Sequence, residues 1–472
     1  MGGHRMHLRD IRHRLPDRFA THRRAPGALL LAALLGLAAA SPVTAAPAQH
    51  SPQPNTVVTF TFDDGSASQA TGAEVLQRHG MHGTFYIISG AVASPGYLGH
   101  DELRRIAEEG HEIGGHTVTH PDLTQVSSDE MRRQICDDRA NLSRWGYQVT
   151  SFTAPFDEVD DDVRAAVDRC GYSSARTMGG LRAPRDCPDC VDAESMPPAD
   201  AYAIRSPGML TRETTVDELK ETVTRADDSG GGWVPLVLHQ TCDMCGPLAV
   251  SPGVLDEFAA WLHDRGTAVR TVHEVIGGTV APVHRAPPPQ QRDRPVNASL
   301  ERAGPDGVPL GWETGGWGKN TPVWTRTRDA HDGEWAQRLD MPRFTDGDAK
   351  LMSTLDLGEY ALPARKGQNY SLSTWYKSTA PTQLAVYYRD RVGQWRYWAA
   401  GPTFAPAEQW AQASWTTPPV PEEATGISFG LALFSRGSLT TDDYGARVNA
   451  EASNDSACRE LDWWVPRRWL CL

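Results

Sequence analysis

The sequence carries little positive charge for a chain of 472 residues. Lysine and arginine together number 46, against 59 aspartates and glutamates, so the formal net charge is −13 at pH 7. Nucleic acids and anionic membrane surfaces attract basic proteins, so an acidic chain is poorly suited to bind them. We therefore expect neither a nucleic-acid nor a membrane partner, and the acidity suits a protein that acts on a neutral polymer.

The chain also lacks an apolar run long enough to cross a bilayer. The run at residues 27–40 is too short, follows an arginine-rich leader, and precedes the small residues Val43-Thr44-Ala45. We predict that residues 1–45 are a secretory signal, with an uncleaved membrane anchor as the alternative. Cleavage would remove seven arginines and two aspartates and change the net charge to −18. The expected product is a secreted, extracellular protein with no membrane attachment.

The eight cysteines are expected to form disulfides, because an exported protein meets an oxidising environment. Two Cys-x-x-Cys pairs also allow a zinc knuckle, but export favours cross-links. The residues are Cys136 and Cys170, expected to pair; Cys458 and Cys471, expected to pair; and the two motifs Cys187/Cys190 and Cys242/Cys245.

A pair of adjacent carboxylates ends the first apolar run. Residues 57–62 alternate in a way that predicts a buried strand, and Asp63, Asp64 and Gly65 follow it. At a strand end the turning chain can aim both acids into one cleft. Two aspartates normally repel each other, so a cation is the usual reason for such a pair. A turn with no further role is the simpler alternative.

Two histidines occur four residues apart about fifty residues later. His116 and His120 would share a face in a helical turn. One carboxylate and two imidazoles leave a divalent metal with open positions, which is typical of a catalytic site. A third apolar run, residues 234–238, ends at His239, which could act as the general acid of a hydrolysis. His239 could also be an ordinary core histidine.

These segments resemble the polysaccharide deacetylases of carbohydrate esterase family 4. The resemblance covers about residues 55–280 and rests on residues 61–65, 110–120 and 236–239, with residues 83–87 similar to the second strand of the family. It implies a distorted (β/α) barrel with the site at the strand ends. It also implies a divalent metal, most simply Zn²⁺.

The resemblance assigns a role to each matching residue. Asp63 would be the base and His239 the acid, while Asp64, His116 and His120 would bind the metal. Leu238, Pro155 and Phe156 would line the substrate pocket.

Two family features are missing from the sequence. The family arginine that orients the base is expected near Thr153 or Ala154, and neither residue is an arginine. We also find no Asp-x-x-Asp-Trp stretch to partner the acid histidine. The acidic residues between 157 and 162 could substitute, but a solvated helix start explains them better.

A proline-rich segment, residues 281–296, divides the chain and reads as a semi-rigid linker. After it, short β-type runs recur between turn residues, for example at residues 370–376, 384–388 and 426–433. This spacing predicts an antiparallel all-β sandwich over residues 297–450, followed by a tail at residues 451–472.

The predicted sandwich resembles jelly-roll carbohydrate-binding modules. It starts with residues 297–301, Asn-Ala-Ser-Leu-Glu, and ends near Asp442-Asp443-Tyr444. Its many tryptophans must serve partly as core, and others could stack on sugar rings. Trp395 and Tyr397 are the leading candidates for sugar contact. Such modules often hold a structural Ca²⁺, whose ligands we do not assign.

The sequence therefore predicts a secreted, monomeric, metal-dependent enzyme that removes acetyl groups from N-acetylated polysaccharide. An O-acetyl xylan esterase with the same site is one alternative. The other is an inactive protein that only binds the cell wall, which the missing arginine would favour.

Overall fold

The structure is a computed structural model that describes residues 56–183, 187–304 and 307–449. The predicted signal peptide, the predicted Cys458–Cys471 pair and the predicted tail all lie outside the described residues. Of the helices in the described part, none is long and apolar enough to span a membrane.

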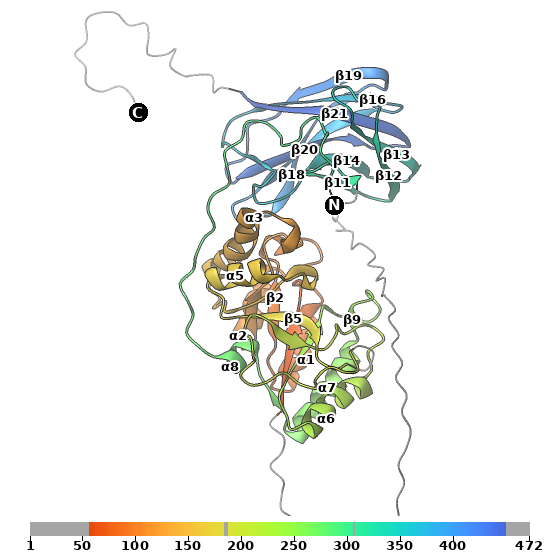
Figure 1. Cartoon of the computed structure of the whole chain (residues 1–472). Coiled ribbons are helices and arrows are strands. Elements are labelled where there is room, and N and C mark those ends of the chain that lie inside the picture. Colours follow the sequence, from red (N-terminus) through yellow and green to blue (C-terminus); the bar gives the residue numbers. More distant parts are fainter. Residues whose placement is uncertain (1–55, 184–186, 305–306, 450–472) are drawn as a thin grey trace, which may run out of the picture. The chain divides into compact units, whose positions relative to one another are not determined.

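The first region is a nearly closed parallel β-barrel, as the resemblance implied (Figure 1). The sheet runs in the order β10-β1-β2-β3-β4-β5-β6, and β7 pairs with β1. Its strands are β1 (Val57–Phe62), β2 (Thr84–Ile87), β3 (Glu112–Gly115), β4 (Ser151–Thr153), β5 (Ser174–Gly180), β6 (Ile204–Ser206), β7 (Trp233–Leu238) and β10 (Ala268–Val269). Because the strands are parallel, their carboxyl ends gather at one rim of the barrel.

The central strands β1 and β7 are buried along their whole length, since apolar residues fill both runs. They pair in register from Val57 opposite Trp233 to Phe62 opposite Leu238. This register brings the residues that follow each strand, Asp63 and His239, to neighbouring positions at the rim.

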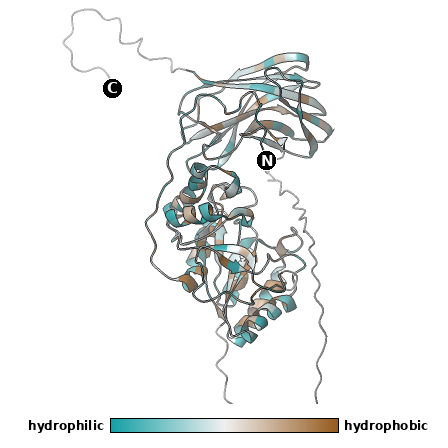
Figure 2. Cartoon of the chain, in the orientation of Figure 1, coloured by the Kyte–Doolittle hydropathy of each residue, from teal (hydrophilic) through white to brown (hydrophobic). Residues whose placement is uncertain are grey.

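Amphipathic helices cover the barrel, and their hydrophilic residues are teal in Figure 2. Their ends carry standard signals, such as the capping box of Thr215 with Glu218 before α6. The helices are α1 (Gln69–Arg78), α2 (His100–Glu108), α3 (Ser128–Arg132), α4 (Asp138–Arg144), α5 (Asp161–Arg169), α6 (Val216–Asp228), α7 (Pro252–Arg265) and α8 (Val272–Ile276).

The second region is an all-β sandwich of two antiparallel sheets with a core of its own, as predicted. One sheet has the order β11-β14-β20-β17-β18, with β15 beside β20, and the other the order β12-β13-β21-β16-β19. Its strands are β11 (Trp312–Trp317), β12 (Asn320–Thr327), β13 (Ala336–Phe344), β14 (Asp348–Ser353), β15 (Leu362–Pro363), β16 (Tyr370–Ser378), β17 (Thr382–Arg389), β18 (Trp395–Phe404), β19 (Ala407–Thr416), β20 (Gly426–Leu433) and β21 (Gly437–Val448).

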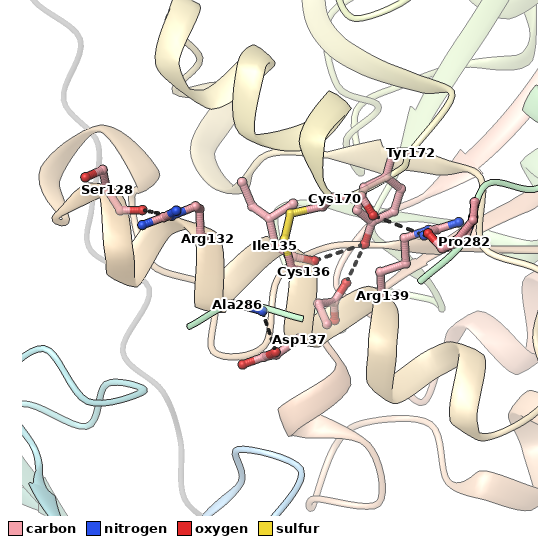
Figure 3. Close-up of a disulfide and its surroundings, with 11 residues drawn as sticks. Ser128, Arg132, Ile135, Cys136, Asp137, Arg139, Cys170, Tyr172, Pro282 and Ala286 are labelled. Atoms are coloured by element: carbon pink, nitrogen blue, oxygen red, sulfur yellow. Dashed lines mark hydrogen bonds between the residues drawn. A yellow bond between two sulfur atoms is a disulfide. The ribbon is translucent and has the colours of Figure 1, made fainter. Parts of the chain in front are cut away.

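The expected disulfide between Cys136 and Cys170 is present (Figure 3). Cys136 belongs to a π-helical turn, Arg133–Asp137, between α3 and α4. In the same neighbourhood, Arg139 donates hydrogen bonds to the carbonyls of Ala281 (2.8 Å) and Pro282 (2.9 Å). The start of the predicted linker is therefore fixed to the barrel region.

In each Cys-x-x-Cys motif, the two cysteines form a disulfide with each other. Cys187 is bonded to Cys190, and Cys242 to Cys245. These pairs are cross-links, as export favoured, and they do not form the alternative zinc knuckle.

Candidate metal and catalytic site

The two aspartates after β1 diverge at the barrel rim. Asp64 adopts φ 78° and Gly65 φ 75°, so the chain bends through two left-handed residues immediately after the strand. This bend aims Asp64 at the two histidines and leaves Asp63 buried against Arg176.

Asp64, His116 and His120 form a group that could hold a metal ion. The Oδ1 atom of Asp64 lies 3.3 Å from Nε2 of each histidine, and the three ligand atoms all lie within 4.8 Å of one another. One carboxylate oxygen and two imidazole nitrogens are donors that suit Zn²⁺. Of the residues that the structure describes, no other group of three or more histidine, cysteine, aspartate or glutamate side chains is arranged in this way. The Ca²⁺ of the second region stays a prediction.

The orientation of His116 fits a metal ligand. Its Nδ1 lies 2.7 Å from the carbonyl oxygen of Thr153, and a carbonyl only accepts, so Nδ1 carries the proton. In the neutral ring Nε2 then presents a lone pair towards Asp64. A lone pair that faces a carboxylate needs a cation between them, or a second proton on the ring.

The two histidines do not lie on one face of a helix. The expectation of a helical turn here is wrong. The segment after β3 is irregular, with Thr117 at φ 67° and His120 at φ 62°. These left-handed residues fold the chain back so that the two rings approach edge to face, with centroids 4.8 Å apart. The spacing predicted the convergence of the rings but not the backbone that produces it.

The charges of this group are strongly coupled. Burial raises the pKa of Asp64, but hydrogen bonds and charge from His116 and His120 outweigh burial and hold that pKa well below its usual range. Burial lowers the pKa of His116, but Asp64 and Asp63 more than compensate and raise it overall. For His120 burial prevails and the pKa falls. The group therefore favours an ionised carboxylate beside its imidazoles.

Asp63 is held by an arginine that the sequence motifs do not indicate. Nη2 of Arg176 donates to Oδ2 of Asp63 at 2.5 Å, and both side chains are buried. The other oxygen, Oδ1, is buried and has no hydrogen-bond partner among the described residues, so its lone pairs are unpaired. The arginine thus places a positive charge beside the carboxylate and fixes its orientation.

Arg176 lies one strand away from the position where an arginine was expected. It is on β5, and in the parallel ladder it pairs directly with Thr153 on β4. Thr153 meanwhile donates from Oγ1 to the carbonyl of Arg176 at 3.1 Å. Strand β4 has no arginine at this point, and the guanidinium comes instead from Arg176, the residue paired with Thr153 on β5.

His239 follows β7 and lies beside Asp63 at the rim. The backbone N–H of Asp63 donates to the carbonyl of Leu238 at 2.8 Å, which joins the two strand ends. Nδ1 of His239 is buried and has no hydrogen-bond partner among the described residues, so none of them fills the role of the missing family aspartate. Leu238 is fully buried.

An exposed aromatic ring lies beside the metal group. Phe156 is 51% exposed, adopts φ 59°, and contacts His120 edge to face with centroids 4.7 Å apart. The Phe156 ring is therefore placed to contact a molecule that binds at the metal group. Pro155 is buried in the turn before it.

The acidic stretch after Phe156 divides into two parts. Asp160 caps α5 by accepting from the N–H of Val163 at 2.9 Å, as expected for a helix start. Asp157 instead turns inwards and accepts from the N–H of Met178 at 2.5 Å. Burial raises the pKa of Asp157 to about 6, with a further contribution from the charge of Asp63.

A buried carboxylate, that of Asp138, binds the backbone of the segment that carries His116. Asp138 accepts hydrogen bonds from the backbone N–H groups of Ser89 (3.2 Å) and His116 (3.1 Å) and from the Tyr172 hydroxyl (3.3 Å). A side chain at Gly115 would collide with the Tyr172 hydroxyl, 2.1 Å from its Cβ. Asp138 therefore fixes the backbone of one metal-group residue.

The aromatic residues proposed for sugar contact differ in exposure. Tyr397 is 54% exposed and meets Tyr387 edge to face at 5.7 Å. Trp395, two residues earlier on β18, is half-buried against a cluster that contains Met352 and Tyr387. Trp312 belongs to the sandwich core.

Comparison with known proteins finds similarity in the first region. Residues 50–175 match the model of the polysaccharide deacetylase family. The peptidoglycan-N-acetylglucosamine deacetylase PgdA of Listeria monocytogenes is 34% identical over 113 residues, which cover 23% of each chain. A chitooligosaccharide deacetylase of Rhizobium leguminosarum is 42% identical over 79 residues, 16% of this chain and 34% of that protein. The chain thus spans about a quarter to a third of these relatives.

Solved structures align with about half of the chain. The Bc1960 peptidoglycan N-acetylglucosamine deacetylase covers 49% of this chain and 92% of its own, with 19% identity and a TM-score of 0.34. The Xyl-CE4 domain of a xylanase from a Trinervitermes trinervoides hindgut metagenome covers 49% and 95%, with 20% identity and the same TM-score.

Proposed function

We propose that this chain, which contains a polysaccharide deacetylase domain, is a secreted, metal-dependent enzyme that removes acetyl groups from N-acetylated polysaccharide. The observation that carries the proposal is the convergence of Asp64, His116 and His120 beside the buried Asp63–Arg176 pair. The names of the relatives favour a peptidoglycan- or chitin-type substrate over acetylated xylan.

In this proposal, each residue of the rim has one task. An ion held by Asp64, His116 and His120 would supply Lewis acidity to the acetyl carbonyl and lower the pKa of water. Asp63, oriented by Arg176, takes a proton from the attacking water through Oδ1. His239 gives a proton to the departing amine. Phe156 and Leu238 wall the space beside the reacting carbon.

The proposal answers the alternative of an inactive wall-binding protein. That alternative was based on the missing arginine, and Arg176 occupies the corresponding role from β5. A buried carboxylate without a counter-charge would be neutralised or poorly oriented, whereas this one is paired.

Parallel acetate-release assays test the proposal. Purified full-length protein loaded with Zn²⁺ should release acetate from peptidoglycan or chitin oligomers much faster than from acetylated xylan. A preference for xylan would favour the esterase alternative. Absence of acetate from all three substrates, with metal bound, would favour the inactive one.

We further propose that the β-sandwich binds polysaccharide through an exposed aromatic surface on β18. Tyr397 supports this most directly, because an exposed ring can stack on a sugar face. The full-length Tyr397→Ala variant should bind insoluble polymer more weakly and cleave small soluble substrates normally. Trp312→Phe, which alters the core, is the matched control for general destabilisation.

A further inference from the structure

A buried glutamine connects the two strand ends that carry Asp63 and His239. Gln69 is the first residue of α1 and is fully buried. Its Nε2 donates to the carbonyl of Asp63 and, at 2.8 Å, to the carbonyl of His239. One side-chain amide therefore contacts the backbone of both residues proposed as base and acid.

The glutamine acts where the regular sheet pairing of these strands ends. The last rung between β1 and β7 is the bond from the Asp63 N–H to the Leu238 carbonyl. Beyond it the chains separate, Asp63 towards the left-handed turn at Asp64 and His239 towards β8 (Gln240–Thr241). The two N–H groups of Gln69 link the chains at this point.

Other contacts of α1 reinforce the link. The hydroxyl of Ser68 accepts from the N–H of Thr241 at 3.2 Å. A Cβ at Gly72 would lie 2.7 Å from the ring of Phe62 and 2.8 Å from the hydroxyl of Thr241. The start of α1 is thus packed tightly on the end of β1 and on the segment after β7.

Among uncharged side chains, only a carboxamide offers two donors from one atom. Both acceptors are carbonyl oxygens, so the side chain must offer two donors from one atom. Glutamate has the same shape, but its ionised carboxylate would face two carbonyl oxygens with no proton to share. Methionine has a similar length and no donor at all.

We infer that Gln69 is a positioning residue that fixes the separation of Asp63 and His239, an inference that rests on the proposed function. Hydrolysis of an amide needs a base that takes a proton from the attacking water and an acid that gives a proton to the leaving nitrogen, both placed around one carbonyl carbon. A displacement of about 1 Å between such groups can cost roughly 100-fold in rate. The metal-group residues are not bonded to Gln69, so its loss should alter turnover rather than metal content.

Substitutions of the same size test the inference. Gln69→Met should lower kcat roughly 10- to 100-fold while KM stays within about twofold and the bound metal is unchanged. Gln69→Glu should be equally impaired at pH 8 and should recover relative to wild type as the pH falls, because a protonated glutamate can donate one bond. Gln337→Leu is the control, since Gln337 is an equally buried glutamine of β13. A loss for Gln69→Met no larger than for Gln337→Leu, or equal losses for Met and Glu at every pH, would overturn the inference.

Hydrogen exchange separates this inference from the proposed function. Amide exchange at residues 63–65 and 239–241 should accelerate in Gln69→Met and not in Gln337→Leu, whatever reaction the wild type catalyses. Unchanged exchange would overturn the positioning role. A wild-type enzyme that releases no acetate from any acetylated polymer would instead overturn the proposed function.

Discussion

Arg176 on β5 and Asp63 after β1 form a buried ion pair, with 2.5 Å between Nη2 and Oδ2. The pair joins two strands that are not neighbours in the sheet, β1 and β5. The ion pair gives the proposed base a fixed orientation. It also gives the base a permanent counter-charge, because an arginine stays protonated at any pH at which the protein is folded.

Arg176→Met should lower kcat/KM roughly 100- to 1000-fold, since Asp63 would lose its orientation and its counter-charge. It should also destabilise the fold by about 3–5 kcal/mol, the usual cost of leaving a buried charge unpaired. Steady-state kinetics and denaturant unfolding measure the two effects. The double variant Arg176→Thr with Thr153→Arg, which moves the guanidinium to the paired position, should recover part of the activity. No recovery would mean that only β5 can orient Asp63.

Asp63→Asn should keep the metal and lose nearly all turnover, because the base is removed and the metal group remains. Asp64→Asn and His116→Ala should lose the metal. Metal analysis of the purified variants distinguishes these outcomes. A metal-free Asp63→Asn protein would exchange the roles of the two aspartates.

Asp138→Asn should weaken metal binding roughly 10- to 100-fold, because an amide cannot accept from the N–H groups of Ser89 and His116 with both ends. Tyr172→Phe, which removes one donor to Asp138 and no acceptor, is the milder matched variant. Competition with a chelator gives both affinities. Unchanged affinity in Asp138→Asn would show that the disulfide and the strand ladder hold His116 sufficiently.

Asp157→Asn should lower kcat/KM above pH 6 and leave it unchanged below about pH 5. Burial raises the pKa of Asp157 to about 6, so the residue is charged only above that pH, where it adds negative charge near Asp63. The folded state holds this proton more tightly than the unfolded chain, so the charge costs stability as pH rises through 6. The variant should therefore melt higher than wild type at pH 7.5 and equally at pH 4. Equal melting temperatures of the variant and the wild type at pH 7.5 would contradict the raised pKa of Asp157.

His239→Ala should impair cleavage of an N-acetyl amide much more than cleavage of an acetate ester with a good leaving group. The departing amine needs a proton, whereas a phenolate leaves without one. Parallel assays with both substrates give the ratio. Equal losses would remove His239 from the role of acid.

The sequence predicted the barrel, the sandwich and the convergence of Asp64 with two histidines. The barrel was implied by the family resemblance, whereas the sandwich and the metal group came from local patterns, since alternating or continuous apolar runs ended at turn residues or at residues that carry chemistry. The convergence also follows from topology, because parallel strands end at one rim.

The sequence did not predict Arg176, because its position gives no local signal. Residues 174–180 are small or polar apart from one methionine, so an arginine among them reads as a surface residue. Only the register of β5 against β4 places it beside Thr153. The useful signal was indirect: a buried aspartate beside a metal group requires a counter-charge, and the expected one was missing.

The backbone of the rim is unusually rich in left-handed residues other than glycine. They are Asp64, Thr117, His120, Phe156 and Asp157. Each such residue costs of order 1–3 kcal/mol, which the surrounding structure must offset. Laboratory evolution towards heat resistance should therefore favour glycine or asparagine at Thr117 and Phe156, where strain is relieved without exchanging a charged group. The same replacements would free the turns that aim the metal group, so heat-resistant descendants of this chain are expected to be slower enzymes.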